Sequence, residues 1–231
     1  MAVLYIIGTP IGNLGDISFR AAEILKTVSM AACEDTRRTL KLLNHLGIRL
    51  PLISCRAQNE RAAAEKVAAA LDGGRNVAYA SDAGTPALSD PGAVLVRAAV
   101  RAGHQVVPVP GPSAFAALVS VSGGMDKSVV FEGFLSPRGG RRRSRLRELL
   151  AGDAAFVLYE SPFRILKLLE DLADLDGERY VCIGREMTKV HEEYLRGSAA
   201  QILAVLREKN GQIGEFSVFV SGKKCDSAIN L

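Results

Sequence analysis

The amino-acid sequence predicts an α/β fold with two successive α/β domains. Short apolar runs alternate with segments in which apolar residues recur at helical spacing, as expected for sheets covered by helices. Segments rich in glycine and proline follow several apolar runs in the first half of the chain. Residues 122–126 read Ser-Gly-Gly-Met-Asp, a composition typical of a hinge. We therefore expect an N-terminal domain over residues 1–122 and a C-terminal domain over residues 126–231.

Strands and helices alternate regularly along the first domain. Helical segments with one apolar face separate five apolar runs, and glycines end several of these helices. The predicted strands are Val3–Gly8, Val28–Cys33, Leu52–Cys55, Asn76–Ser81 and Gln105–Val109, and the last two of them precede helices at Ala93–Ala102 and Ser113–Val121. This alternation implies a parallel or mostly parallel sheet with helices on both faces.

Loops at the carboxyl ends of the strands are the expected ligand sites of such a sheet. Three of them contain glycines and prolines, which let the backbone approach a ligand closely. These loops are Gly8–Gly15, Asp82–Gly92 and Pro108–Pro112. The Asp82 carboxylate can accept hydrogen bonds from amino or hydroxyl groups. The alternatives are structural: a tight turn in the first loop, and helix capping by Asp90 and Ser113 after the other two.

The second domain is predicted from four further apolar runs and one basic segment. The predicted strands are Val129–Phe134, Ala154–Tyr159, Tyr180–Arg185 and Phe216–Val220, with helical patterns between the later ones. Arg138–Arg147 holds six arginines in ten residues, with Gly139-Gly140 among them. We expect this run to be a flexible loop that makes non-specific contacts with phosphates. Arg185–Glu193 is either the far side of the ligand site or a charged surface loop.

Composition narrows the function classes. The 231 residues are 48% hydrophobic and 23% charged with a net charge of +4, which permits a nucleic-acid partner without requiring one. The four cysteines and three histidines are scattered, so we expect no metal site, no disulfide framework and a cytoplasmic location. The N-terminal apolar run is broken by Gly8 and Pro10 and predicts a buried strand instead of a signal peptide. No apolar stretch is long enough for a membrane span.

An acidic and basic cluster follows the second predicted strand. Glu34, Asp35 and Arg37 lie in the stretch Cys33-Glu34-Asp35-Thr36-Arg37-Arg38. The acids could supply a general base, and the arginine could hold a phosphate or a ribose. The alternative is a helix start, since acidic residues favour the first turn of a helix. The residues alone leave both interpretations open.

Taken together, these motifs resemble one family. They are Thr-Pro-Ile-Gly-Asn-Leu (9–14), Glu-Asp-Thr-Arg (34–37), Ser-Asp-Ala-Gly-Thr-Pro (81–86), Ser-Asp-Pro-Gly (89–92), Pro-Gly-Pro-Ser-Ala (110–114), Glu-Ser-Pro-Phe-Arg (160–164) and Arg-Glu-Met-Thr-Lys (185–189). The chain resembles the S-adenosylmethionine (SAM)-dependent tetrapyrrole methylase superfamily over nearly its whole length. Within it, the motifs are similar to those of bacterial enzymes that methylate the ribose 2'-hydroxyl of a cytidine in small-subunit ribosomal RNA.

The resemblance implies two α/β domains that hold SAM in the cleft between them, in a homodimer. It implies that SAM contacts Pro10, Ile11, Asp82, Thr85, Ser113 and Ala114, with Tyr159 and Glu186 contributed by the second domain. Glu34 or Asp35 would then remove the proton of the ribose hydroxyl or orient it, and Arg37 would hold a neighbouring phosphate. The implied partner is small-subunit ribosomal RNA, either free or in the assembled subunit.

Two other functions compete with this interpretation. A methyltransferase of the same fold could act on a tetrapyrrole precursor, whose many carboxylates would also suit a basic protein. The Glu-Asp-Thr-Arg stretch favours RNA, by resemblance alone. A non-catalytic RNA-binding module is the third possibility, but a simple binding module needs no pocket lined by glycine- and proline-rich loops.

Overall fold

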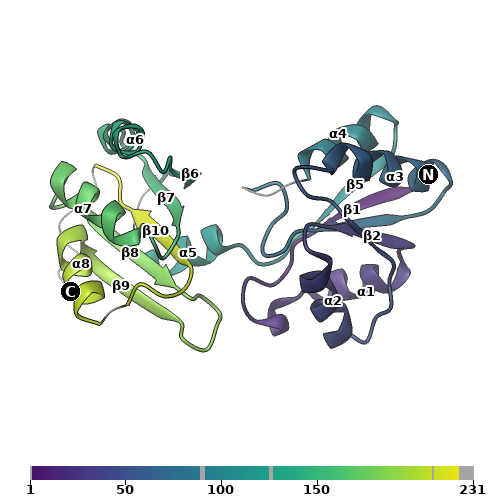
Figure 1. The fold of residues 1–231 in the computed structure, drawn as a ribbon, viewed down its shortest axis with the longest axis horizontal. Coiled ribbons are helices and arrows are strands. Elements are labelled where there is room, and N and C mark those ends of the chain that lie inside the picture. Colours follow the sequence, from purple (N-terminus) through teal and green to yellow (C-terminus); the bar gives the residue numbers. More distant parts are fainter. Residues whose placement is uncertain (1, 89–91, 125–126, 210, 224–231) are drawn as a thin grey trace. The chain divides into compact units, whose positions relative to one another are not determined.

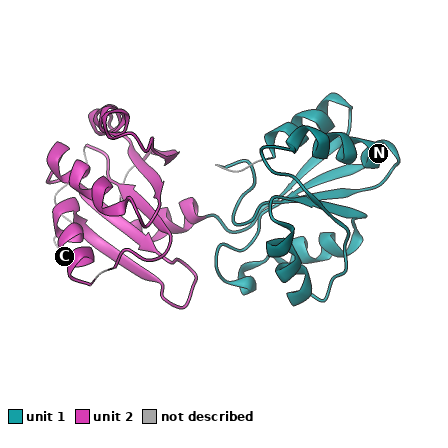
Figure 2. Ribbon diagram, viewed as in Figure 1, with its two compact units in different colours: residues 1–113 teal, residues 114–231 magenta. Residues whose placement is uncertain are grey.

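The computed structural model describes residues 2–88, 92–124, 127–209 and 211–223. The chain forms two compact units, Met1–Ser113 and Ala114–Leu231 (Figure 2). Helix α5 (Ala114–Ser122) belongs to the second unit because it packs on strands of the second sheet, and Tyr180 Oη donates a 2.6 Å hydrogen bond to its last carbonyl. The division therefore precedes the segment 122–126 that the sequence suggested as a hinge. Met125 and Asp126 of that segment lie outside the described residues.

A five-stranded parallel sheet forms the centre of the first unit. Its strands are β1 (Val3–Ile7), β2 (Met30–Cys33), β3 (Leu52–Ser54), β4 (Val77–Ala80) and β5 (Gln105–Val109). They pair in the order β3-β2-β4-β1-β5, every pair parallel. This confirms the α/β fold and the parallel sheet predicted from the alternating pattern.

Helices cover both faces of this sheet (Figure 1). They are α1 (Phe19–Thr27), α2 (Thr36–His45), α3 (Glu60–Asp72) and α4 (Ala93–Arg101), with a short 3-10 turn η1 (Leu14–Asp16) before α1. Ile7 packs with Leu25 of α1 and Leu43 of α2, whereas Leu4 packs with α3 and α4. Because side chains alternate along a strand, β1 serves two cores at once, as strands of a doubly covered parallel sheet do.

The second unit has a mixed sheet. Its strands are β6 (Val129–Phe134), β7 (Ala155–Glu160), β8 (Tyr180–Arg185), β9 (Glu193–Ser198) and β10 (Phe216–Val220), in the order β6-β7-β10-β8-β9. Only β6 and β7 pair in parallel, and β10 runs antiparallel to both of its neighbours. Strand β9 was not predicted from the sequence. It lies at an edge and pairs with β8 alone, so it carries charged residues and lacks a clear apolar alternation.

The prediction that the arginine run is a flexible loop was wrong. Residues Gly139–Ala151 form helix α6; the other helices after α5 are α7 (Ile165–Leu175) and α8 (Ala199–Glu208). Leu146 and Leu150 of α6 enter the core, and Arg142 joins them on the buried side. Arg142 can be buried there because Asp171 of α7, itself buried, forms a 2.7 Å ion pair with it. Arginine is a good helix former, so the segment folds as a helix once its buried charge has a partner.

The helices are short. The longest, α3 and α6, have 13 residues each. A helix needs about 20 consecutive, mostly apolar residues to cross a bilayer. Within the described ranges, no helix meets both the length and the apolarity that a membrane span requires.

Candidate active site

Four loops of the first unit meet at one edge of its sheet. Strands β2, β4, β1 and β5 are neighbours and parallel, so the loops that follow them leave from the same edge. The β1 and β4 loops are tied by a reciprocal pair of hydrogen bonds: Thr9 N donates to Gly84 O at 2.9 Å, and Gly84 N donates to Thr9 O at 3.0 Å. β1 continues into α1 on one face, whereas β4 leads to α4 on the other. Two adjacent loops that diverge in this way leave a crevice of the kind that binds ligands in α/β sheets.

The β1 and β5 loops touch through their glycines. A Cβ atom on Gly8 would lie 2.8 Å from Gly111 N, and one on Gly111 would lie 2.6 Å from Gly8 O. Both distances are shorter than van der Waals contact, and the opposing atoms belong to the backbone, which cannot rotate away. Glycine is therefore required at both positions by the close approach of two chain segments.

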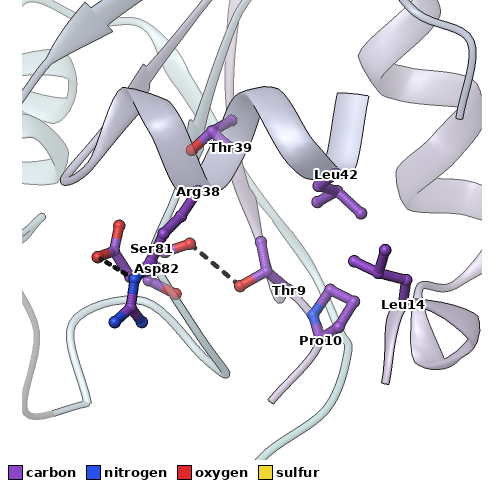
Figure 3. A pocket seen from close by; sticks show the side chains of 8 residues that line it. All are labelled: Thr9, Pro10, Leu14, Arg38, Thr39, Leu42, Ser81 and Asp82. Atoms are coloured by element: carbon purple, nitrogen blue, oxygen red, sulfur yellow. Dashed lines mark hydrogen bonds and ion pairs between the residues drawn. The ribbon is translucent and has the colours of Figure 1, made fainter. Parts of the chain in front are cut away.

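A small pocket opens between the β1 loop, the β4 loop and α2 (Figure 3). Its volume is about 60 Å³, room for roughly two water molecules. It is lined by Thr9, Pro10, Leu14, Arg38, Thr39, Leu42, Ser81 and Asp82. In Figure 3, Arg38 and Asp82 lie at one end, and Pro10, Leu14 and Leu42 lie at the other. The pocket therefore has a charged end and an apolar end.

Asp82 connects this pocket to the acidic cluster. Its Oδ1 accepts a 2.8 Å hydrogen bond from the backbone N–H of Asp35, and its Oδ2 lies 3.6 Å from Nε of Arg38. The carboxylate after β4 thus holds the turn that follows β2. The sequence singled out both segments, but nothing in their spacing indicated that they are in direct contact.

Asp35 is the N-cap of α2. Its Oδ1 accepts a 2.9 Å hydrogen bond from Arg37 N, and its carboxylate is also paired with the Arg37 guanidinium, with 2.6 Å between Oδ2 and Nη2. These hydrogen bonds from Arg37 hold the pKa of the Asp35 carboxyl well below its usual range. The structure thus shows the capping arrangement that the sequence left open, and it shows Arg37 bound to Asp35. A part for either residue in catalysis stays a prediction.

Glu34 lies in a different environment. Its side chain is half-buried, and burial raises the pKa of its carboxyl, with a further contribution from the negative charge of Asp82. Its carbonyl accepts a 3.2 Å hydrogen bond from Nε of Arg56, which fixes the backbone. Among the described residues, no group donates a hydrogen bond to the Glu34 carboxylate. A carboxylate with a raised pKa and free lone pairs can accept a proton from a substrate.

The remaining first-unit candidates line the same loops. Pro10 lines the pocket, and Ile11 lies against Gly84, where its Cγ2 would be 3.5 Å from an added Cβ. The Thr85 hydroxyl donates a 3.4 Å hydrogen bond to Pro112 O and so joins the β4 and β5 loops. Ser113 is the last residue of the unit.

Three of the predicted SAM contacts belong to the second unit. Ala114 is the first residue of α5. Tyr159 in β7 packs edge-on against Phe131 and Phe134, with ring centroids 5.0 and 5.7 Å apart. Glu186 follows β8 with a φ of 50°, a left-handed conformation that is uncommon outside glycine. Burial acts to raise its pKa, but hydrogen bonds from Lys189 Nζ and Glu215 N outweigh that effect and lower it.

Sequence reasoning missed the anchor of the β4–α4 connection. The Glu60 carboxylate at the start of α3 accepts hydrogen bonds from Gly92 N at 2.9 Å and Val94 N at 3.4 Å. It thereby occupies the N-terminus of α4, where free N–H groups favour an anion. Asp90, which the sequence suggested as the cap, lies outside the described residues. Glu60 could not be found from local spacing because it is distant in sequence.

The cysteines described by the structure are core residues. Cys33, Cys55 and Cys182 are buried and free, and burial raises the pKa of each thiol, that of Cys55 to about 12. A thiol with a raised pKa is a poor nucleophile at neutral pH. Cys225 lies beyond the described residues. Within those residues, no three histidine, cysteine or acidic side chains gather where they could hold a metal ion.

The model of one protein family, Tetrapyrrole (Corrin/Porphyrin) Methylases, matches residues 3–203 and so includes all four loops of the sheet edge. The chain belongs to the tetrapyrrole methylase family. The family also explains why the glycine- and proline-rich loops gather at the carboxyl ends of parallel strands: in such folds that edge is where ligands bind.

Several relatives are similar to this chain over nearly its whole length. It is 46% identical to the ribosomal RNA small subunit methyltransferase I of Borrelia garinii subsp. bavariensis, over 95% of this chain and 98% of that protein. It is 44% identical to the protein of the same name from Thermotoga maritima, over 97% and 100%. The protein of that name from Escherichia coli O157:H7 is 43% identical, over 96% of this chain and 78% of its own length.

Two solved structures share the fold. One is a cobalamin biosynthetic enzyme, cobalt precorrin-4 methyltransferase, with a TM-score of 0.68, 15% identity and coverage of 95% of this chain and 94% of that chain. The other is a uroporphyrin-III-C-methyltransferase from Thermus thermophilus, with a TM-score of 0.68, 17% identity and coverage of 96% and 94%. At this identity they establish the architecture alone.

Proposed function

We propose that this chain is a SAM-dependent methyltransferase that acts on the 2'-hydroxyl of a cytidine ribose in small-subunit ribosomal RNA. One observation carries the proposal: the chain is 46% identical, over 95% of its length, to a protein named ribosomal RNA small subunit methyltransferase I. The choice of a ribose hydroxyl rests on the motif resemblance and on the chemistry of the Glu34 carboxylate.

The sheet edge of the first unit carries groups that suit part of a ligand such as SAM. Glycines at positions 8 and 111 let the β1 and β5 loops meet closely there, and the pocket beside Thr9 offers one charged and one apolar end. Asp82 can accept hydrogen bonds from amino or hydroxyl groups, and Pro10, Ile11 and Thr85 lie on the same loops. SAM supplies a methyl group that its sulfonium has already activated for transfer.

We assign the general base to Glu34. A ribose hydroxyl is a poor nucleophile until a base takes its proton. The Glu34 carboxylate is half-buried, has a raised pKa and lies next to the Asp82 loop, so it can take that proton at the sheet edge. The rest of the catalysis is positioning, since nucleophile, methyl carbon and leaving group must be held in line.

The test is transfer of a tritiated methyl group from SAM to small ribosomal subunits purified from cells that lack this protein. We expect incorporation into the small-subunit RNA and none into a reduced tetrapyrrole. Alkaline hydrolysis should leave the label in a dinucleotide, because a 2'-O-methyl group blocks strand cleavage at that phosphate. Label released as a mononucleotide would place the methyl group on a base, and labelled tetrapyrrole would reassign the substrate.

We further propose that the protein works in the cytoplasm as a homodimer. The ribosomal RNA relatives and the scattered cysteines support the location, and the family resemblance supports the dimer. Comparing free RNA with intact small subunits in the same assay decides which is methylated faster. Light scattering of the purified protein gives its mass, and a monomeric mass would end the dimer proposal.

A further inference from the structure

Five of the six arginines in the run 138–147 divide into two groups, and the sixth, Arg147, is exposed further along α6. Arg142, Arg143 and Arg145 form ion pairs inside the second unit: with Asp171, with Asp171 and Asp174, and with Glu132 and Glu148. Arg145 binds Glu132 through two hydrogen bonds of 2.7 and 2.8 Å, which fixes α6 beside β6. These three arginines stabilise the fold and are already paired with carboxylates.

Arg138 and Arg141 belong to the other group. Both are exposed, and no carboxylate of the described residues lies within ion-pair distance of either. Arg138 precedes the first turn of α6, and Arg141 lies in that turn. The start of a helix carries a partial positive charge from its free N–H groups, and this charge adds to the charges of the two arginine side chains. This end of α6 is therefore positively charged without an internal partner.

An exposed aromatic ring stands at the end of the neighbouring strand. Phe163 follows β7 and is 94% exposed. The turn that carries it is fixed: Arg164 forms a 2.6 Å ion pair with Glu160, which is buried, and the backbone N–H groups of Arg164 and Ile165 both donate to Ser161 O at 3.1 Å. The fixed turn holds the Phe163 ring out in solvent, where its face is available to stack against a partner.

Phe134 provides a second ring at the same sheet edge. It ends β6, is 58% exposed and packs edge-on against Tyr159, its register partner in β7. Because β6 and β7 are parallel, Phe134 and Phe163 leave the sheet at the same edge. Arg138 comes four residues after Phe134, within about 14 Å along the chain. We call Phe134, Arg138, Arg141 and Phe163 the β6–β7 rim.

We propose that the β6–β7 rim is a docking surface for single-stranded RNA, with bases stacked on the two phenyl rings and phosphates bound by the two arginines. This rests on the proposed function, and it adds where on the second unit the substrate RNA binds. Exposed aromatic rings and unpaired guanidinium groups on segments that follow two parallel strands are a combination that can bind single strands without strict sequence preference. Paired bases in a duplex would not be free to stack in this way.

A second copy of the chain is a poorer occupant. In a two-fold symmetric interface the same patch meets itself. Both copies of Arg138 and Arg141 would then lie in one interface, and the four residues of the rim include no carboxylate to neutralise them. RNA instead offers a regular array of negative charges. Charge complementarity therefore favours a nucleic acid.

The stacking contact is tested at Phe163 in the full-length protein. The probe is a short fluorescein-labelled single-stranded RNA, with the duplex of the same sequence beside it. Phe163→Ala should weaken binding of the single strand by roughly 5- to 150-fold, the effect of losing one stacked base, and of the duplex by much less. Phe163→Tyr should retain affinity because it keeps the ring. Phe19→Ala is the control, since Phe19 is equally exposed on the first unit.

The phosphate contacts are tested by charge. The double variant Arg138→Ala/Arg141→Ala should weaken RNA binding and reduce the slope of log affinity against log salt by about 1.4, since each phosphate contact on a single strand contributes about 0.7. Arg97→Ala/Arg101→Ala removes the same net charge from the exposed side of α4 and should leave the slope unchanged. SAM affinity and melting temperature should match the wild type in all variants.

Four results would overturn the proposal that the β6–β7 rim binds RNA. Equal losses of affinity for the single strand and the duplex would exclude stacking. An equal effect of the Arg97→Ala/Arg101→Ala control would show that Arg138 and Arg141 act only through the net charge of the protein. A change of oligomeric mass in Phe134→Ala or Phe163→Ala would make the rim an interface between copies. Methyl transfer by the wild type separates the proposals: rim variants that bind RNA normally while the wild type methylates subunits refute the rim alone. RNA binding that depends on the rim, without any methyl transfer, refutes only the proposed function.

Discussion

The two sheets present their functional edges in different ways. At the edge of the first sheet, backbone contacts set the shape of the site: Gly8 packs against Gly111, and the backbone of Thr9 exchanges hydrogen bonds with that of Gly84. At the β6–β7 edge of the second sheet, side chains set the properties of the surface. Some arginines there are paired with carboxylates, and the others are available to a partner. A site shaped by backbone leaves glycines and prolines in the sequence. A site that depends on which charges form ion pairs leaves no local signal in the sequence.

The strongest test of the second unit removes its buried charge partner. Arg142→Ala should lower the free energy of unfolding by about 3 kcal/mol, because it removes one of the two arginines that pair with buried Asp171 and leaves the partly exposed Arg143 as its partner. Urea unfolding of the purified protein measures this. The double variant Arg142→Met/Asp171→Leu should recover most of the loss, since it removes both charges. If Arg142→Ala unfolds at the wild-type urea concentration, α6 does not depend on the pair.

The next test concerns chemistry at the first sheet. Glu34→Gln should lower the single-turnover methylation rate by roughly a hundredfold or more while SAM affinity is retained. In the wild type the rate should fall on acidification at a pH above the usual glutamate pKa of about 4.3, because burial raises the pKa of Glu34. A near-normal rate in the variant would remove Glu34 as the base.

Glu34→Gln also tests how the Glu34 carboxyl affects stability. A raised pKa means that the folded protein prefers protonated Glu34, so its contribution to stability is complete below the ordinary pKa and is lost as pH rises through the folded value. At neutral pH, Glu34→Gln should therefore be at least as stable as the wild type. A lower melting temperature would point to a structural role.

The backbone contact in the first sheet is tested at Gly8. Gly8→Ala places a Cβ 2.8 Å from Gly111 N, which should cost about 1–3 kcal/mol of stability and weaken SAM binding as the two loops move apart. Gly73→Ala is the matched control, because its nearest neighbours would lie 3.4 Å away or more. Calorimetry gives both the melting temperature and the SAM affinity. Wild-type values for Gly8→Ala would show that the loops tolerate separation.

The smallest effect is expected at Asp35. Asp35→Ala should lower the melting temperature slightly through loss of the α2 cap, whereas Asp35→Asn should keep most of it, since asparagine also caps helices. Because Arg37 lowers the pKa of Asp35, the cap contributes above the usual aspartate pKa of about 3.9 and is lost as pH falls through the lowered value. The gap between wild type and Asp35→Ala should therefore narrow in acid. A large loss of turnover at unchanged melting temperature would instead make Asp35 catalytic.

Much of the first unit could be predicted from the sequence because its signals are local. Apolar runs, helix faces and glycine stops placed all five strands of the parallel sheet, and the strand ends placed the ligand loops. The contact between Asp82 and the Asp35 turn could not be predicted, since it depends on which strands are neighbours. The same is true of Glu60, which reaches the start of α4 from another helix.

The second unit was harder because its signals are indirect. Strand β9 has the charged composition of an edge and resembles a loop when taken alone. Helix α6 was hidden by its arginines: the burial of Arg142 makes sense only once Asp171 of α7 is known to face it. Leu146, Leu149 and Leu150 fall at helical spacing, and this was the signal that could have identified the helix.

The Gly8–Gly111 contact also limits how the protein can evolve. Two backbone segments in contact leave no space for a side chain, so no other amino acid can replace glycine at either position unless a loop moves. Changes in ligand preference must then come from neighbours that do present side chains, such as Thr9, Leu14 and Leu42. The sheet edge thus combines a glycine–glycine contact that cannot vary in sequence with a few neighbouring positions that can.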